Sequence, residues 1–256
     1  MSDPRPAVVG KRLAEVGRIV AFCSAKGGVG KTLCTVLSAL QLARAGARVG
    51  LLDLDTQGAS AHVFLGVTPR LPDEEKGILP LAVTEGLTLM GVAPFSGERG
   101  LALRGPDVSD AILELLAVTQ WGKADFLLVD MPPGIGEEIL DLSRLIPRLQ
   151  ALVVSTPSAV SVTVVERLLS VLREIRMTVP GVIANMVDGD AGPVRSLADR
   201  HGVPFVGEIP RDRAIERGVG SLEALRSSRA AAAARDALAA LGWMPGAGGR
   251  AAGGRL

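Results

Sequence analysis

Short apolar runs alternate with segments of helical spacing along most of the chain. The apolar runs predict strands at 19–22, 48–52, 87–92, 126–130, 151–155, 181–185 and 203–209. The helical spacing predicts helices at 33–45, 107–121, 137–145, 161–177, 193–201 and 221–241. Strands that alternate with helices are typical of a parallel sheet that is covered on both faces. We therefore expect the α/β class, with a doubly wound, mainly parallel sheet.

The segments outside this pattern set the expected domain boundaries. Residues 1–17 are mostly polar and are expected to form a short arm, whereas 66–86 and 94–106 are expected to be surface connections. Residues 245–256 are mostly Gly, Ala and Arg, a composition typical of disorder. No repeat or linker divides the remainder, so we predict that 18–244 form one domain.

The composition indicates which cellular compartment and which classes of partner are to be expected. The chain has 256 residues, of which 48% are hydrophobic, and its net charge is +1. This balance gives no general reason to expect a nucleic acid or a membrane as partner. The first 17 residues are mostly polar and no run of about 18 apolar residues occurs, so we expect neither a signal peptide nor a membrane span. Cys23 and Cys34 give no disulfide framework, and we expect a reduced, cytoplasmic protein.

The stretch 22–32 carries the strongest chemical signal. It joins a predicted strand to a predicted helix and reads FCSAKGGVGKT. Glycines let backbone N–H groups surround an anion, and the following helix directs its N-terminal donors at the same point. Lys31 would reach the β- and γ-phosphates, and Thr32 would place a hydroxyl on Mg²⁺. The predicted nucleotide-binding set is Gly27, Gly28, Val29, Gly30, Lys31, Thr32 and Leu33.

The lysine content supports this interpretation of the loop. Only five of the 28 basic residues are lysines, and two of them, Lys26 and Lys31, lie in this one loop. A compact ammonium fits a tight phosphate cradle better than a planar guanidinium does. The alternative is a glycine turn with two solvated lysines.

Acidic residues follow two of the predicted strands. Asp130 ends a strand, where a carboxylate would hold Mg²⁺ through a water, and a proline-rich turn at 132–134 would sense the γ-phosphate. Asp53 continues its strand and is interpreted as structural, whereas Asp55 lies further into the loop. Asp55 would contact Mg²⁺ or orient the attacking water. The predicted catalytic residues are Lys26, Lys31 and Asp55, and the predicted metal ligands are Thr32, Asp55 and Asp130.

A base-binding pocket is expected where the last two strands end. Asn185 ends one strand, and Pro210, Arg211 and Asp212 end the next. An Asn side chain can read the edge of adenine, and a loop after a strand can wall the ring. A turn role for Asn185 is equally compatible with the sequence.

The motifs together resemble a known family. The loop 26–32, with its early Lys26, resembles the deviant Walker A motif of the ParA/MinD-like ATPases. The segments 53–60, 103–106, 121–134, 185–186 and 202–210 are similar, in order, to motifs of the Mrp/ApbC branch. The resemblance covers about 18–218. It implies a homodimer that binds MgATP, hydrolyses it slowly, reaches the partner's nucleotide with Lys26, and carries iron–sulfur clusters to client proteins.

One motif of that family is missing here. The family holds its cluster on a C-x-x-C pair shortly after Asn-Met, but the corresponding stretch 185–193 contains no cysteine. Fe–S clusters need thiolate ligands. We therefore expect the ATPase but not the cluster site, with a client that the sequence does not identify.

Two other function classes stay open. Relatives in the ParA and MinD branches position cargo on DNA or membrane, and 195–235 contain eight arginines against five acids, which would give a weakly basic face. Salt-sensitive DNA retention or liposome flotation would favour this class. The third class is an adaptor that binds ATP without hydrolysing it, and the intact loop argues against it.

Overall fold

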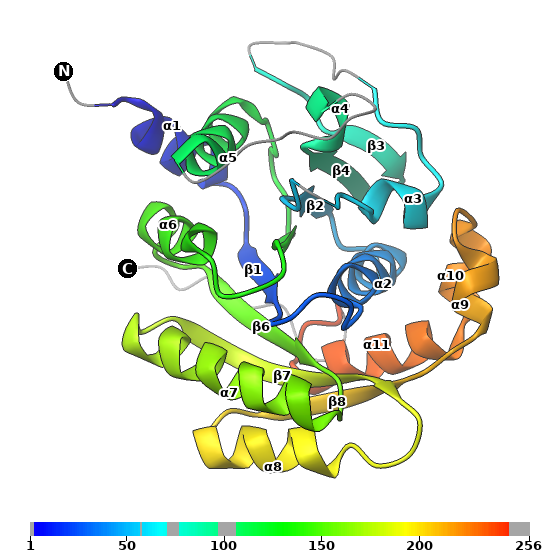
Figure 1. Cartoon of the computed structure of the whole chain (residues 1–256). Coiled ribbons are helices and arrows are strands. Elements are labelled where there is room, and N and C mark those ends of the chain that lie inside the picture. Colours follow the sequence, from blue (N-terminus) through cyan, green and yellow to red (C-terminus); the bar gives the residue numbers. More distant parts are fainter. Residues whose placement is uncertain (1–2, 57, 71–76, 97–105, 246–256) are drawn as a thin grey trace.

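The computed structural model describes residues 3–56, 58–70, 77–96 and 106–245 (Figure 1). Its eight-stranded sheet has the order β3-β4-β2-β5-β1-β6-β7-β8. Neighbouring strands are parallel except for β3 and β4, which are antiparallel. The strands are β1 (Arg18–Cys23), β2 (Val49–Asp53), β3 (Leu81–Thr84), β4 (Leu87–Gly91), β5 (Phe126–Asp130), β6 (Gln150–Ser155), β7 (Thr178–Val187) and β8 (Phe205–Pro210).

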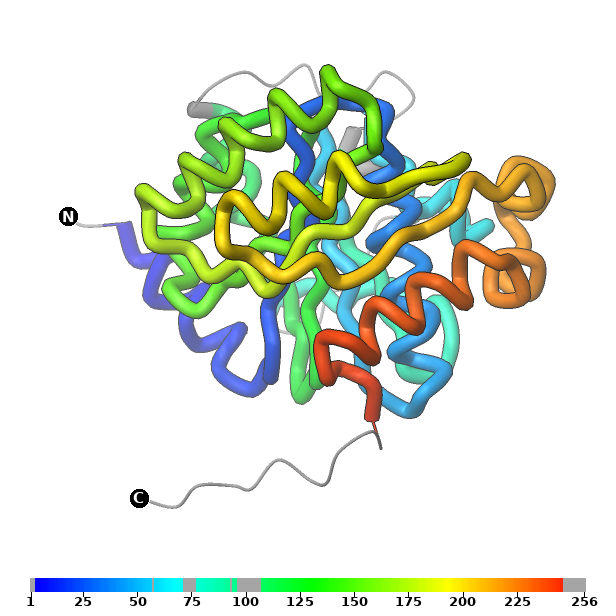
Figure 2. The backbone as a smooth tube through the Cα atoms, turned by 90° about the horizontal axis from the view of Figure 1, so that it is seen from below, coloured from blue at the N-terminus to red at the C-terminus, as the bar shows by residue number. Residues whose placement is uncertain are grey.

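Helices cover both faces of this sheet. One apolar layer joins the sheet to α1 (Arg5–Leu13), α5 (Pro106–Val118), α6 (Glu137–Leu145), α7 (Ala159–Glu174) and α8 (Gly192–His201). The other layer joins it to α2 (Lys31–Arg44), α3 (Ala61–Leu65), α9 (Ala214–Gly218), α10 (Leu222–Ser227) and α11 (Arg229–Ala240). Figure 2 shows α7 and α8 on one side of the last strands and α11 on the other. The predicted α/β, doubly wound, mainly parallel fold is confirmed.

Three local predictions differ from the structure. The expected arm contains α1, whose Val9 and Leu13 are buried against the sheet layer that includes α5. The expected surface connection 66–86 contains β3, which pairs with β4 and forms one edge of the sheet. The short helix α4 (Ala93–Ser96) lies in the second expected connection. The predicted tail lies almost entirely outside the described residues, as do residues 103–105 of the family motif.

The single helix predicted over 221–241 is two helices. Ser228 has an extended backbone (φ −69°, ψ 155°) between α10 and α11. Its hydroxyl accepts a hydrogen bond from the Ala231 N–H at 3.0 Å, so it caps α11. A serine that caps the following helix offers the backbone an alternative to continuing the previous one. The apolar periodicity runs through this break and therefore did not reveal it.

The strand register places the loops that follow β1, β2 and β5 together at the carboxyl ends of the strands. Asp130 of β5 lies beside Phe22 of β1 on one side and beside Asp53 of β2 on the other. β1 has β5 on one flank and β6 on the other, and the glycine loop follows β1. In open α/β sheets, ligands bind in such a crevice, outside the carboxyl ends of the strands.

The cap at Ser228 can be tested by substitution. We expect Ser228→Ala to lower the free energy of unfolding by about 1 kcal/mol, because the Ala231 N–H then loses its acceptor. Urea denaturation would measure the change. Ser227→Ala removes an exposed hydroxyl one residue earlier that donates to carbonyls of its own helix and accepts from no N-terminal N–H, and it should stay within about 0.5 kcal/mol of wild type. Equal losses in both variants would contradict the role of the cap.

Candidate active site

The glycine loop lines an open cleft of about 260 Å³ at the carboxyl edge of the sheet. All seven residues predicted to bind nucleotide, Gly27 through Leu33, line it, together with Lys26 and Asp55. Gly28 and Gly30 both have φ +77°, a left-handed conformation that L side chains rarely adopt. The backbone at both positions therefore requires glycine, and α2 begins directly after the second one.

A buried ion pair lies at the inner end of the loop. The Lys31 Nζ lies 2.6 Å from Asp130 Oδ1, and the two side chains are 6% and 0% exposed. The Thr32 hydroxyl donates to the other carboxylate oxygen at 2.6 Å. The Thr35 hydroxyl, one turn further along α2, also lies 3.1 Å from Asp130 Oδ1. Lys31, Thr32 and Asp130, predicted separately, therefore form one contact set.

The two carboxylates in neighbouring strands share one lysine. Burial raises the pKa of Asp130, and the ammonium of Lys31 opposes the rise. Burial, and next the negative charge of Asp130, raise the pKa of Asp53 to about 7. The ionised forms of these two neighbouring carboxylates are therefore disfavoured, and only one ammonium lies beside them in the part of the chain that the structure describes. Such a site favours an additional cation.

Asp53 organises the loop that carries Asp55. One of its oxygens accepts from the Asp55 N–H at 3.1 Å, and the other accepts from the N–H groups of Ser60 (3.1 Å) and Ala61 (3.0 Å) at the start of α3. This matches the structural role that the sequence indicated for Asp53. The partly exposed Asp55 lines the cleft, and one of its oxygens accepts from the Gly58 N–H at 2.8 Å.

The proline-rich turn after β5 is attached to the loop after β1. The Gly134 N–H donates to the Ser24 carbonyl at 2.9 Å, and Pro133 lines the cleft. Gly134 has φ +110°, which again favours glycine. The turn predicted to sense the γ-phosphate is therefore in hydrogen-bond contact with the segment that leads into the glycine loop. Lys26, two residues after Ser24, is exposed to solvent.

Asn185 supports the glycine loop from behind. Its side-chain amide is 1% exposed and donates to the Val29 carbonyl at 2.7 Å. A Cβ on Gly30 would collide with this amide. Met186 has φ +55°, a conformation uncommon outside glycine, at a register irregularity near the end of β7. Here Asn185 contacts the loop backbone and is not among the residues that line the cleft.

Two of the other predicted base-pocket residues, Arg211 and Asp212, line a separate pocket. The third, Pro210, is the last residue of β8. Arg211 Nε lies 2.6 Å from Asp188 Oδ2. Asp212 accepts from the Arg229 N–H at 2.9 Å and so contacts the start of α11. The structure therefore does not bring Pro210, Arg211 and Asp212 into the cleft of the glycine loop, and their contact with a base stays a prediction.

Sequence reasoning assigned no role to three residues of the cleft region, although Ser60 belongs to the family motif 53–60. Thr35 contacts Asp130 because it lies four residues after Lys31, on the same face of α2. Ser60 and Phe64 line the cleft because Asp53 fixes the start of α3 beside it. The helical spacing of Thr35 from Lys31 was a signal that could have been used. No pattern marked α3, which has only five residues.

The cysteines do not form a metal site. Cys23 and Cys34 are buried, and burial raises the pKa of each thiol to about 12. Within the described ranges, no group of three or more His, Cys, Asp or Glu side chains is placed to hold a metal ion. No helix of the part that the structure describes is long and apolar enough to cross a membrane.

The fold, the glycine loop and the Lys31–Asp130–Thr32 contacts define a P-loop nucleotide-binding protein. The family model described as the NUBPL iron-transfer P-loop NTPase, of the ParA group, matches residues 15–241. The chain belongs to this family, as the resemblance in its sequence implied. Hydrolysis of a nucleoside triphosphate is the general activity of P-loop NTPases.

Curated relatives point in the same direction. An iron–sulfur cluster carrier protein of Pseudomonas fragi is 34% identical over 216 residues, which cover 77% of this chain and 74% of the relative. A protein of the same name from Mycobacterium bovis is 35% identical over 217 residues, which cover 77% of this chain and 56% of the relative. A third protein of this name, from Methanocaldococcus jannaschii, is 32% identical over 223 residues, which cover 80% of this chain and 77% of the relative.

Solved structures share the fold. A nucleotide-binding protein of Archaeoglobus fulgidus, solved in complex with ADP, is 26% identical with a TM-score of 0.73, covering 87% of this chain and 93% of its own. The cell division ATPase MinD of Pyrococcus furiosus is 23% identical with a TM-score of 0.66, and the match covers 88% of this chain and 98% of MinD. At that identity the second likeness shows the fold alone.

The shifted carboxylate of Asp53 predicts a pH dependence of stability. Its pKa rises to about 7 in the folded state from 3.8, so between these values the folded protein keeps a proton that the unfolded chain has lost. Through this group alone, the free energy of unfolding falls by up to about 1.4 kcal/mol per pH unit across that window. Above it the contribution is constant.

We expect Asp53→Asn to weaken this dependence. Urea denaturation without nucleotide and with a chelator should show a smaller decrease between about pH 5 and about pH 7 in the variant than in wild type. Asp53→Asn also alters the hydrogen bonds to 60–61, so the slope with pH, and not the absolute stability, is the readout. Equal slopes would show that Asp53 titrates normally in the folded state.

Proposed function

We propose that this protein is a homodimeric ATPase that binds and slowly hydrolyses MgATP, and that it uses ATP to control a client protein in metallocluster assembly. The observation that carries the proposal is the buried contact set of Lys31, Thr32 and Asp130 at the end of a glycine loop. The membership in an iron-transfer NTPase family and the names of the curated relatives support the cellular process.

The oxygen donors of the site fit Mg²⁺. The Thr32 hydroxyl and the Asp130 carboxylate lie side by side, and Asp55 lines the same cleft. Mg²⁺ binds to proteins through one or two carboxylates together with substrate phosphates and water. We propose that Thr32 and Asp130 hold it, the carboxylate through a water, with Asp55 near the same position. When bound, Mg²⁺ neutralises charge that develops on the phosphates.

The residues of this chain would then act by positioning and charge neutralisation. Lys31, released from part of its contact with Asp130, places its ammonium on the β- and γ-phosphates. Backbone N–H groups of the glycine loop bind the same phosphates. Asp55 orients the attacking water. Phosphoryl transfer needs no covalent nucleophile, so this set is sufficient for hydrolysis.

Lys26 is proposed to act in the partner subunit. It is exposed at the outer side of the cleft, whereas Lys31 already occupies the inner end. A second copy facing the carboxyl edge of the sheet would receive this ammonium near its own nucleotide. The side chains of Ile135 and Val160 are 39% and 62% exposed and provide apolar surface near the same edge. In a symmetric dimer, each subunit would complete the site of the other.

The cluster itself is proposed not to bind this chain. The named relatives are cluster carriers. Here the stretch 185–193 has no cysteine, and Cys23 and Cys34 are buried on the two faces of the sheet, in separate apolar layers. Thiolate ligands for a shared cluster are therefore missing. We propose that ATP acts through the geometry of the dimer on a client that holds the metal.

Mixed dimers test the contribution in trans. We expect Lys26→Ala and Asp55→Asn each to abolish ATP turnover, with Lys31→Ala as the background. Mixing Lys26→Ala with Asp55→Asn forms dimers in which one site has both groups, so turnover should recover to roughly a quarter of wild type. Lys26→Ala mixed with the double variant that carries both Lys26→Ala and Asp55→Asn should stay inactive, because no subunit then has Lys26. No recovery in the first mixture would contradict an action of Lys26 on the partner's nucleotide.

Reconstitution tests the missing cluster site. After anaerobic incubation with iron and sulfide, followed by desalting, we expect no stoichiometric iron and no charge-transfer absorption, because accessible thiolates are lacking. An iron–sulfur carrier from the same family, such as the Pseudomonas fragi protein, serves as the positive control. A stable, stoichiometric cluster on the full chain would overturn the proposal that this protein acts without carrying it.

A further inference from the structure

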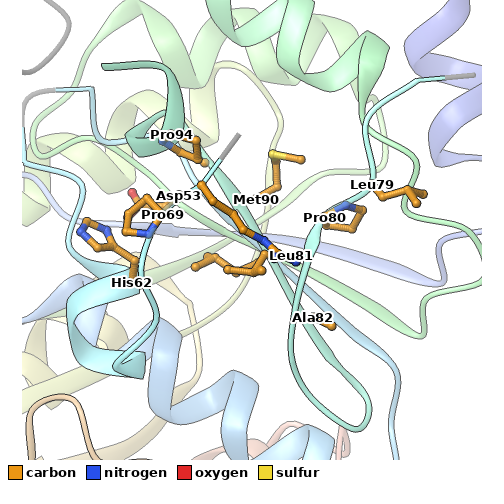
Figure 3. A pocket seen from close by; sticks show the side chains of 12 residues that line it. Asp53, His62, Pro69, Leu79, Pro80, Leu81, Ala82, Met90 and Pro94 are labelled. Atoms are coloured by element: carbon orange, nitrogen blue, oxygen red, sulfur yellow. The ribbon is translucent and has the colours of Figure 1, made fainter. Parts of the chain in front are cut away.

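A second pocket, which we call the β3–β4 pocket, lies on the other side of Asp53 from the glycine loop. Its volume is about 180 Å³, and β3, β4, α3 and the segment after α3 contribute to its walls. Figure 3 shows Asp53, His62 and Pro69 on one side of the space and Leu79 and Pro80 on the other. None of the residues of the glycine loop lines it, so it is distinct from the nucleotide cleft.

The walls of this pocket are apolar around one buried carboxylate. Leu81, Leu89 and Met90 supply aliphatic and thioether surface. Asp53 is 3% exposed, and its oxygens accept three backbone N–H bonds. A carboxylate has about four acceptor positions, so it can accept one more. Burial lowers the pKa of His62, so this imidazole adds no positive charge there at neutral pH.

These features define the chemistry of an occupant. An apolar cavity of about 150 Å³ accepts a benzene-sized molecule, so this pocket has room for one ring or two fused rings. A group that faces the ionised carboxylate of Asp53 must donate a hydrogen bond, because a second acceptor would leave two buried acceptors opposed. Arg70 is exposed at the wall and makes no ion pair with Asp53 among the described residues. An anionic group is therefore disfavoured next to Asp53.

We propose that the β3–β4 pocket binds a small ligand with a compact aromatic body that carries a hydrogen-bond donor toward Asp53. The ligand would affect the nucleotide cleft, because Asp53 also holds the loop with Asp55 and the start of α3. A fourth donor on the same carboxylate weakens its three bonds to these backbone donors and so loosens the loop. This second part rests on the proposed ATPase function, whereas binding does not.

Binding can be measured on the full chain without nucleotide. Indole and benzofuran are the probes, since they have nearly the same shape and only indole has a donor. The chain has six methionines, and ¹³C-methyl labelling reports Met90 in the pocket wall, with Met90→Leu assigning its signal. We expect a saturable shift of this signal, with indole binding about tenfold more tightly than benzofuran.

A variant that covers the pocket provides the matched control. Ala82 is exposed on β3 and lines the pocket, and tryptophan is favoured in strands, so Ala82→Trp should abolish the indole shift. Glu85→Trp adds the same ring at an exposed turn position outside the pocket and should leave the shift unchanged. Indole should lower ATP turnover in wild type and Glu85→Trp but not in Ala82→Trp.

Each result bears on one part of the proposal. The absence of a saturable Met90 shift, or an undiminished shift in Ala82→Trp, overturns the binding site. Equal affinity for indole and benzofuran overturns the donor to Asp53. Binding without a change in turnover overturns the link to Asp55. If wild type shows no turnover at all, the ATPase proposal fails while the Met90 titration still decides whether the pocket binds.

Discussion

The ion pair between Lys31 and Asp130 is the interaction on which the rest of the site depends. Its atoms lie 2.6 Å apart, and both side chains are buried. Removing one member of such a pair typically costs about 3–5 kcal/mol, because an uncompensated charge is left inside the protein. The pair also fixes where α2 begins relative to β5. The glycine loop, which joins β1 to α2, is consequently held beside the open cleft.

Two carboxylates lie near the single ammonium of this pair, and this balance of charges affects the chemistry of the site. Asp53 and Asp130 are adjacent in register, and one ammonium serves both. Burial, and next the negative charge of Asp130, raise the pKa of Asp53. A divalent cation that arrives with a nucleotide would oppose this rise. Since Asp53 also holds the loop of Asp55, the charge state of the site and the position of the candidate water-orienting group are physically linked.

The nucleotide site and the family's cluster site lie on different strands. The contact set is built at the ends of β1, β2 and β5, whereas the stretch without cysteines follows Asn185 near the end of β7. Asn185 links the two through its hydrogen bond to the Val29 carbonyl. Loss of the thiolates therefore leaves the geometry of the glycine loop intact. This separation is compatible with the proposal of an ATPase site in a chain whose stretch 185–193 contains no cysteine.

Local patterns determined the strands, most helices, the glycine loop and the partners Lys31, Thr32 and Asp130, because apolar periodicity and glycine placement act over a few residues. Only the tertiary structure decided the rest. It inserted β3 at the sheet edge, broke the last helix at Ser228, and placed Arg211 and Asp212 outside the cleft. It also joined Asp53 to α3 and so created the β3–β4 pocket. These features depend on contacts between residues distant in sequence, which no short pattern records.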